Sequence, residues 1–448
     1  MSDNNNLTKG SVTKVMLFFA LPYLLSCFLQ TLYGMADLYV VGLFNDCEVT
    51  SAVAIGSQVT HMLTVIIVGL AMGTTVHIGR AIGADKAEDA RKTVGTTIVL
   101  FTIFAIGLTA ILLLLTKSIT KVMLTPTEAV GDTITYLLIC FSGIPFIVAY
   151  NVISSIFRGA GDSKHPLYFI AVACVVNVLL DFLFVGAFHM GAAGAALATV
   201  CGQAVSVFVA LFVIHKNPFS FRIKREDIRI HKGVLGNILK VGVPVSLQDG
   251  LIQVAFVVIT IIANNRGLVV SASVGIVEKL ISFMFLVPSA FLSAISAITA
   301  QNMGAGKPER ARQSLRIGLV ITITWGILCC LYNHLLPQTL VRLFTKDSAV
   351  VVAGVSYMRA YCFDCVFAAI HFCFSGYFCG DQRSGISFLH NIVSIVLIRI
   401  LGAYFASVYF PYTLYPMGLA APLGSLLSAL ICIGFYIYFW KKDRREMV

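Results

Sequence analysis

The sequence predicts an all-α membrane protein with twelve transmembrane helices, arranged as two six-helix lobes related by pseudo-twofold symmetry. Three observations favour this fold: the composition, a series of long apolar runs and an internal repeat. Of the 448 residues, 58% are apolar and only 12% are charged, with a mean hydropathy of +0.89. Soluble domains carry about a quarter charged residues. The composition therefore excludes a soluble enzyme, a disordered scaffold and a nucleic-acid-binding module, and it makes the lipid bilayer the expected surroundings of the chain.

Apolar runs bounded by charged or turn residues recur along the whole chain. A helix needs about 20 apolar residues to cross a bilayer, and twelve runs meet this length. The first run is too long for a signal peptide and lacks a small-residue cleavage site, so we expect it to be the first span. The expected spans are 13–44, 50–79, 92–116, 131–157, 164–189, 191–215, 236–265, 268–302, 314–336, 350–378, 384–410 and 416–440.

The net charge of +11 is unevenly distributed over the loops between these runs. Most Lys and Arg residues lie in the termini and in the loops on one side. Loops on the other side carry only a few basic residues, which are Lys117, Lys121, Arg266, Arg342 and Lys346. The positive-inside rule places the basic loops in the cytoplasm. We therefore expect a multi-pass protein of the plasma (inner) membrane with both termini cytoplasmic, and no nucleic acid as a partner.

An internal repeat appears at an offset of 221 residues, the distance from Gly83 to Gly304. The loops at 83–91 and 304–312 share a pattern of Gly, Ala, Lys, Glu, Ala and Arg. The same offset relates identical residues at the ends of the fourth and tenth spans. Phe157, Gly159 and Ser163 recur as Phe378, Gly380 and Ser384. Six spans separate equivalent marks, so the two halves have the same orientation and form a parallel repeat.

This repeat predicts the domain organisation. We expect an N-terminal lobe at 1–215, a basic cytoplasmic linker at 216–240 and a C-terminal lobe at 241–448. Two lobes around a central cleft are the architecture that alternating access requires. A duplicated structural membrane protein is the other interpretation of the repeat.

Acidic residues inside the apolar runs are candidate functional residues, because a charge in hydrocarbon costs about 2.5 to 3.5 kcal/mol or more. In the N-terminal lobe, Asp37 and Asp181 each lie about eight residues, or roughly 12 Å, from the outer end of their span. Asn177 shares a helix face with Asp181, and Thr199 of the sixth span lies at a similar depth. The Lys residues within the spans of this lobe, Lys14, Lys92 and Lys164, lie at the cytoplasmic ends, and no Lys or Arg lies deeper. These four residues predict a coupling site for H⁺ or Na⁺; the alternative is that both acids only hydrogen-bond Asn177, Thr199 and Tyr33.

The C-terminal lobe carries intramembrane charges of both signs. Glu278, Arg359, Asp364 and Arg399 all lie within spans. Pairing of acid with Arg would make them contacts between helices, and contact with substrate or a cation is the alternative. Arg359 and Asp364 are five residues apart, so they point to different helix faces and are not expected to pair.

Cysteines and histidines add no recognisable site. The twelve cysteines lie mostly within apolar spans and are expected to be small buried hydrophobic residues. Cys362 and Cys365 form C-x-x-C inside a span, without a second such pair. The histidines form no metal-binding pattern, and no nucleotide-binding motif occurs. We therefore expect no catalytic residues, no resident metal beyond a possible Na⁺ at the four N-terminal-lobe residues, and no cofactor other than the coupling ion.

The order of these features resembles the multidrug and toxic compound extrusion (MATE) family, and specifically its DinF/MepA-like bacterial branch. The resemblance covers essentially the whole chain. It rests on Pro22 and Asp37 of the first span, the loop at 83–86, the run at 158–162, and Asn177 with Asp181. It implies that Asp37, Asn177, Asp181 and Thr199 form a cation-coupling network and that Tyr136 lies near it.

The resemblance also implies two further features. Bending of the first helix at Pro22 would accompany protonation, whereas the sequence alone favours a static kink at this proline. The NorM branch uses an acid of the seventh helix as a cation ligand, where this chain offers Gln248 and Gln253, with Asp249 nearer the cytoplasmic end. The candidate substrate and network residues are Tyr33, Tyr136, Gln253, Glu278, Arg359 and Asp364.

The expected function is secondary active export of amphipathic, often cationic compounds in exchange for H⁺ or Na⁺, by a monomer that works through alternating access. Because the sequence has no nucleotide-binding motif, we expect an ion gradient to supply the energy for transport. One alternative is a flippase for lipid or lipid-linked oligosaccharide, which would need a cationic cleft that the N-terminal lobe does not offer. The other is a polytopic membrane enzyme, against which the scattered positions of His61, His77, His371 and His390 argue.

Overall fold

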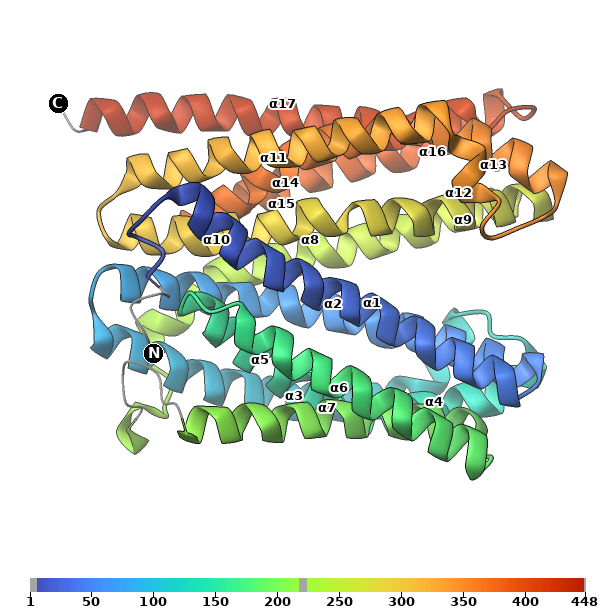
Figure 1. Ribbon diagram of the computed structural model, residues 1–448, viewed down its shortest axis with the longest axis horizontal. Helices are drawn as coiled ribbons and strands as arrows, with labels where there is room; N and C mark the ends of the chain where they lie inside the picture. The colour runs from blue at the N-terminus through green and yellow to red at the C-terminus, as the bar shows by residue number, and fades with distance from the viewer. Residues whose placement is uncertain (1–5, 217–223, 447–448) are drawn as a thin grey trace. The chain divides into compact units, whose positions relative to one another are not determined.

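The computed structural model describes residues 6–216 and 224–446, and every regular element in this part of the chain is helical. The long helices are shown in Figure 1. In chain order the elements are α1 (Val12–Phe44), α2 (Cys47–Gly83), α3 (Ala87–Val122), η2 (Thr127–Ala129), α4 (Val130–Ser142), α5 (Ile144–Gly159), α6 (Lys164–Asp181), η3 (Phe182–Ala187), α7 (Gly191–Lys216), η4 (Arg225–Asp227), α8 (Lys232–Asn264), α9 (Leu268–Met284), α10 (Leu286–Gly304), α11 (Pro308–Leu335), α12 (Pro337–Val341), α13 (Ser348–Tyr361), α14 (Asp364–Gly380), α15 (Ser384–Ser394), η5 (Ile395–Ile400), α16 (Leu401–Tyr409) and α17 (Tyr415–Glu446).

These helices confirm the predicted all-α membrane fold. In the described residues, ten helices are long and apolar enough to cross a membrane, and two bent helix pairs bring the number to twelve if each pair is one span. Many apolar side chains point outward, as a bilayer requires; on α3, Ile103, Ile106 and Leu114 are all exposed. The protein is therefore a multi-pass membrane protein.

The two bent pairs occur at equivalent places in the repeat. Thr127–Ser142 and Ile144–Gly159 meet at 48°, and Ser348–Tyr361 and Asp364–Gly380 meet at 44°. Pro145 in the first turn of α5 explains the first break, because proline lacks the N–H that would continue the helix. The second break at 362–363 has no proline. At the repeat offset of 221, Gly143 corresponds to Asp364, the residue directly after this break.

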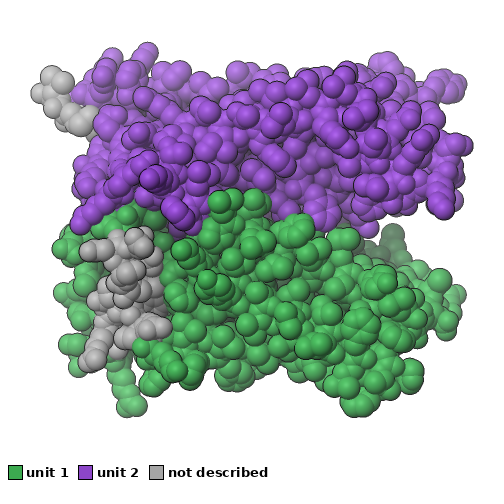
Figure 2. Space-filling view, in the orientation of Figure 1, with its two compact units in different colours: residues 1–7, 21–246 green, residues 8–20, 247–448 purple. Residues whose placement is uncertain are grey.

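The chain divides into two compact units, shown in two colours in Figure 2. Unit 1 contains Leu21–Ser246, and unit 2 contains Thr8–Ala20 and Leu247–Val448. This division differs from the expected lobe boundaries in two segments: the start of α1 belongs to unit 2, and the start of α8 belongs to unit 1. Each of these helices therefore runs from one unit into the other, and Pro22 and Pro244 lie within two residues of the two crossing points.

The segment before each of these helices is tied to the unit in which the helix starts. In unit 2, Arg310 donates hydrogen bonds of 2.7 Å to the carbonyl oxygens of Lys9 and Gly10. In unit 1, Thr96 Oγ1 donates to the Arg229 carbonyl oxygen and accepts from the His231 N–H, both at 3.2 Å. These contacts fix where α1 and α8 begin.

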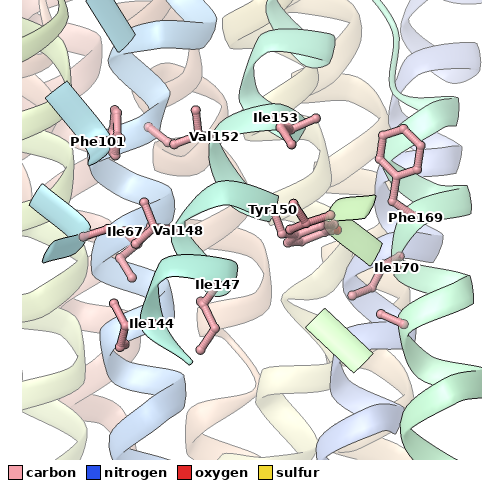
Figure 3. Close-up of a cluster of buried hydrophobic side chains, with 14 of the residues drawn as sticks. Ile67, Phe101, Ile144, Ile147, Val148, Tyr150, Val152, Ile153, Phe169 and Ile170 are labelled. Carbon is pink, nitrogen blue, oxygen red and sulfur yellow. The ribbon is translucent and has the colours of Figure 1, made fainter. Parts of the chain in front are cut away.

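Helix α5 lies at the centre of the unit 1 core. Figure 3 shows part of this buried cluster. The cluster combines α5 residues with residues of α2, α3 and α6, namely Ile144, Ile147, Val148, Tyr150, Val152 and Ile153 with Ile67, Phe101, Phe169 and Ile170. Unit 2 has a separate core built from α8, α9, α11, α12, α13, α14, α16 and α17. Each unit therefore has its own packed interior.

Equivalent glycines close the helix packing in both units. A Cβ at Gly159 would lie 2.8 Å from the Thr75 carbonyl oxygen, and a Cβ at Gly380 would lie 2.6 Å from the Ser296 carbonyl oxygen. Both pairs are related by the repeat offset. Small residues allow backbones to approach closely in membrane helix bundles, so the repeat extends from sequence marks to individual packing contacts.

We expect Gly380→Ala to destabilise unit 2 by about 1–3 kcal/mol, because the new methyl group would overlap the backbone of α10. The matched control is Gly385→Ala, at a position where a Cβ would meet nothing within 4 Å. Thermal unfolding of the purified variants in detergent measures the difference. Equal midpoints for the two variants would contradict this close contact.

Candidate functional site

Four predicted residues of unit 1 lie together inside the helix bundle. Asp37 lies on α1, Asn177 and Asp181 lie on α6, and Thr199 lies on α7. All four are buried, with exposed fractions between 0 and 6%. Thr199 Oγ1 donates a 3.1 Å hydrogen bond to Asp37 Oδ2, and Asp37 lies within interaction range of the side chains of Asn177 and Asp181.

A small residue brings α6 and α7 close enough for this arrangement. Gly202 lies one turn after Thr199, and a Cβ there would lie 3.0 Å from the Ala173 carbonyl oxygen and 3.2 Å from the Asn177 Cβ. The helices can therefore pack with their backbones in close approach. Asp181 is the last residue of α6, and the π-helical segment η3 follows it directly.

Much of the hydrogen-bonding capacity of this cluster is unused. Asp37 Oδ1, both carboxylate oxygens of Asp181 and both amide atoms of Asn177 are buried and have no hydrogen-bond partner of ordinary geometry among the described residues. The ion pairs of those residues include neither Asp37 nor Asp181. Buried polar groups are nearly always satisfied, so these oxygen atoms are available to a small cation.

The two predicted tyrosines border the same cluster. Tyr33 lies one turn before Asp37 on α1, and its buried hydroxyl also lacks a hydrogen-bond partner of ordinary geometry. Tyr136 of α4 is buried and within electrostatic range of Asp37 and Tyr33. Its ring packs against α2 at Gly56, where a Cβ would lie 2.2 Å from Cδ1. The sequence interpretation missed Cys140, which lies one turn after Tyr136 and within range of Asp37; the i, i+4 spacing from Tyr136 was the available signal.

The charges of unit 2 are arranged differently, because an Arg–Asp pair lies among them. Arg399 Nη2 donates a 2.9 Å hydrogen bond to Asp364 Oδ2. Both residues are buried, and Arg399 lies in the π-helical segment η5. Structural pairing, one of the two alternatives for these charges, therefore applies to Asp364.

Glu278 of α9 completes the charged cluster without a direct bond. It lies within electrostatic range of Arg399, and its buried Oε1 has no hydrogen-bond partner of ordinary geometry. Tyr357 and Tyr361 lie in the same cluster; Tyr357 was not among the predicted site residues.

Two predicted residues of the C-terminal half lie outside this cluster. Arg359 is exposed at the end of α13, which agrees with the expectation that it does not pair with Asp364. Gln253 is half-buried on α8. The structure therefore does not gather Glu278, Arg359, Asp364 and Gln253 into one site.

Pro22 lies inside α1 and adjoins the point where this helix passes from unit 2 to unit 1. One turn later, Ser26 Oγ donates a 2.9 Å hydrogen bond to the Pro22 carbonyl oxygen. Such a bond from Ser back to the preceding turn favours helix bending. The geometry is compatible with both alternatives for Pro22, a static kink and a hinge.

Chemically, the unit 1 cluster offers the groups that would hold a small cation. Two carboxyl groups held near each other in a medium of low dielectric constant cannot both be charged without a large free-energy cost. A proton or a desolvated Na⁺ would remove part of that cost, and the amide of Asn177 and the hydroxyl of Thr199 offer further oxygen ligands. In unit 2 the guanidinium of Arg399 already pairs with Asp364.

Comparisons with known proteins agree with this architecture. The model of the MatE family matches the chain twice, over residues 22–183 and 244–405. The probable multidrug resistance protein YpnP of Bacillus subtilis (strain 168) is 29% identical over 83% of this chain and 83% of its own length. The multidrug export protein MepA of Staphylococcus saprophyticus is 24% identical over 88% and 87% of the two chains.

Solved structures share the fold. A MOP superfamily transporter from Pyrococcus furiosus, described as having a binding pocket of reverse polarity, superposes with a TM-score of 0.91. The alignment covers 99% of this chain and 98% of that chain at 22% identity. The resemblance therefore extends over both units.

Proposed function

Because the chain belongs to the MatE family of membrane transporters, we propose that it is a secondary active multidrug efflux antiporter. It exports amphipathic, often cationic compounds in exchange for H⁺ or Na⁺ by alternating access. It works as a monomer in the plasma (inner) membrane, with both termini in the cytoplasm and with no catalytic site. The names of YpnP and MepA, a multidrug resistance protein and a multidrug export protein, support the substrate class.

One observation carries the proposal of ion coupling. Asp37 and Asp181 are buried, lie within range of each other, and have no basic partner among the described residues. Binding of a cation at the two acids favours one packing of α1, α6 and α7, and release restores the charge and favours another. An ion gradient can drive the cycle only through such a difference in affinity between two conformations.

The path of α1 supports a mechanical role for the same site. Asp37 lies in the part of α1 that belongs to unit 1, whereas Thr8–Ala20 belong to unit 2. A change of bend at Pro22 therefore moves the two parts of this helix relative to each other. Helix α8 repeats this arrangement at Pro244.

Uptake by reconstituted liposomes tests the proposal. Ethidium serves as the probe, because it is a planar organic cation whose fluorescence reports its movement. Gradients of H⁺ and Na⁺ are imposed one at a time, with the membrane potential clamped. We expect one of them to raise the rate of counter-directed ethidium transport about tenfold or more, equivalent to about 1.4 kcal/mol of coupling.

Empty liposomes and liposomes without a gradient are the controls. Ethidium movement that responds to neither gradient would contradict antiport. Movement that responds equally with and without the protein would contradict transport itself.

A further inference from the structure

Two pairs of cysteines meet in unit 2 beside the break in the tenth span. Cys329 and Cys330 are neighbours on α11, Cys362 lies in the break between α13 and α14, and Cys365 lies in the first turn of α14. The Sγ atoms of Cys330 and Cys362 are 3.6 Å apart. All four thiols are free. The C-x-x-C pair therefore has a second pair of thiols opposite it, which sequence spacing alone did not indicate.

A close helix contact produces this juxtaposition. A Cβ at Gly326, one turn before Cys330, would lie 2.4 Å from the Cys365 carbonyl oxygen. Met284 adds a fifth sulfur to the region, since its Sδ lies 3.9 Å from Cys365 Sγ and 3.2 Å from Asn333 Nδ2. The backbones of α11 and α14 are therefore held in a position that keeps the thiols facing each other.

The geometry suits bond formation between Cys330 and Cys362. A disulfide bond is about 2.05 Å long, so the two sulfur atoms, now 3.6 Å apart, need to approach by about 1.5 Å. Metal binding is a poorer match, because no group of three His, Cys, Asp or Glu residues suited to a metal ion occurs in residues 6–216 and 224–446.

Access to the pair differs between its members. Cys330 is half-buried, and α11 ends five residues later at Leu335, whereas Cys362 is fully buried. A small lipid-soluble oxidant can therefore react first at Cys330. The buried partner then completes the bond.

We propose that Cys330 and Cys362 are a site of reversible oxidation, at which a disulfide bond joins α11 to the break in the tenth span. Each thiol loses its hydrogen, one S–S bond forms, and two protons and two electrons pass to a two-electron acceptor of the azo or quinone class. The acceptor becomes a hydrazine or a quinol. Exchange with an external dithiol reverses the step.

The bond would restrain the charged cluster of unit 2. Asp364 follows Cys362 by two residues and is held by Arg399. A covalent tie at Cys362 fixes the break, and with it the start of α14, to α11. Oxidation therefore slows any conformational cycle in which the tenth span changes its bend, a consequence that rests on the proposed transport function.

The bond itself is tested without transport. The full-length protein in detergent is treated with diamide, an azo oxidant, then alkylated, digested and analysed by mass spectrometry. We expect a linked peptide pair containing Cys330 and Cys362 that disappears on reduction with dithiothreitol. Cys362→Ser should abolish the link, whereas Cys432→Ser, which removes a buried cysteine elsewhere in unit 2, should leave it intact. Linkage through other cysteines, or none at all, would overturn the proposal.

Ethidium transport then measures the consequence. Diamide should reduce the rate of wild-type protein in liposomes at least threefold, dithiothreitol should restore it, and the Cys362→Ser variant should respond to neither. If the disulfide-linked protein transports ethidium at the unmodified rate, the proposed slowing of transport is refuted, whereas the proposed disulfide bond still stands. A protein that forms the link but transports nothing before oxidation would count against the proposed function instead.

Discussion

Asp37→Asn and Asp181→Asn are each expected to abolish ion-coupled export while the protein still folds and reaches the membrane. Each substitution keeps the shape of the side chain but removes the carboxyl group that would bind H⁺ or Na⁺. We expect the gradient-driven rate of ethidium transport to fall at least about tenfold, which corresponds to a loss of about 1.4 kcal/mol of coupling free energy. Transport in liposomes with one imposed gradient measures this loss.

The folded state of these variants should be no less stable than that of the wild type. The amide removes a buried acid whose charged form lacks a basic partner among the described residues, and an uncharged polar group costs less to bury. Thermal unfolding in detergent checks this point. Glu48→Gln is the matched control, because Glu48 is an exposed acid of the same unit at the start of α2. Normal gradient-driven transport by both Asp variants would refute the coupling role of this cluster.

Arg399→Leu should destabilise unit 2 by about 3–5 kcal/mol. The substitution leaves Asp364 buried without the guanidinium that bonds to it at 2.9 Å, and breaking one side of a buried pair usually costs about this much. The double variant Asp364→Leu/Arg399→Leu should recover most of the loss, because it removes both members of the bonded pair, and only Glu278, which makes no direct bond to Arg399, loses a positive neighbour. Thermal unfolding of the purified proteins measures both effects.

Arg359 provides the control for this prediction. It is exposed at the end of α13 and lies outside the charged cluster. We expect Arg359→Leu to change the free energy of unfolding by no more than about 0.5 kcal/mol, as most surface substitutions do. Similar losses for Arg359→Leu and Arg399→Leu would show that the pair is not the source of the stability.

Much of the candidate site in unit 1 could be predicted from the sequence. An acid inside an apolar run is conspicuous, and the 3.6-residue helical period places Asn177 and Asp181 on one face. Depth along a helix follows from residue counting, so Asp37 could be placed at the level of Asp181. The hydrogen bond from Thr199 to Asp37 joins residues 162 positions apart. It depends on how α1 and α7 are rotated in the bundle, which the sequence does not reveal.

The charges of unit 2 were less predictable. Glu278, Asp364 and Arg399 were all conspicuous in the sequence, but which of them pair was not. Arg399 lies in a π-helical segment, and an extra residue in a helical turn changes the direction of the side chains after it. The helical period could not reveal that change.

By itself, the sequence determined the membrane environment, the positions of the spans, the repeat and the acids of the N-terminal half. Each of these depends on hydropathy, spacing or identity along one stretch of chain, which no neighbouring helix alters. The tertiary structure alone decided the exchange of helix starts between the units at Pro22 and Pro244, the pairing of Asp364 with Arg399, and the meeting of Cys330 with Cys362. These contacts join residues of different helices, and they depend on close backbone packing at glycines and on the breaks and π-helical turns that set where each side chain points.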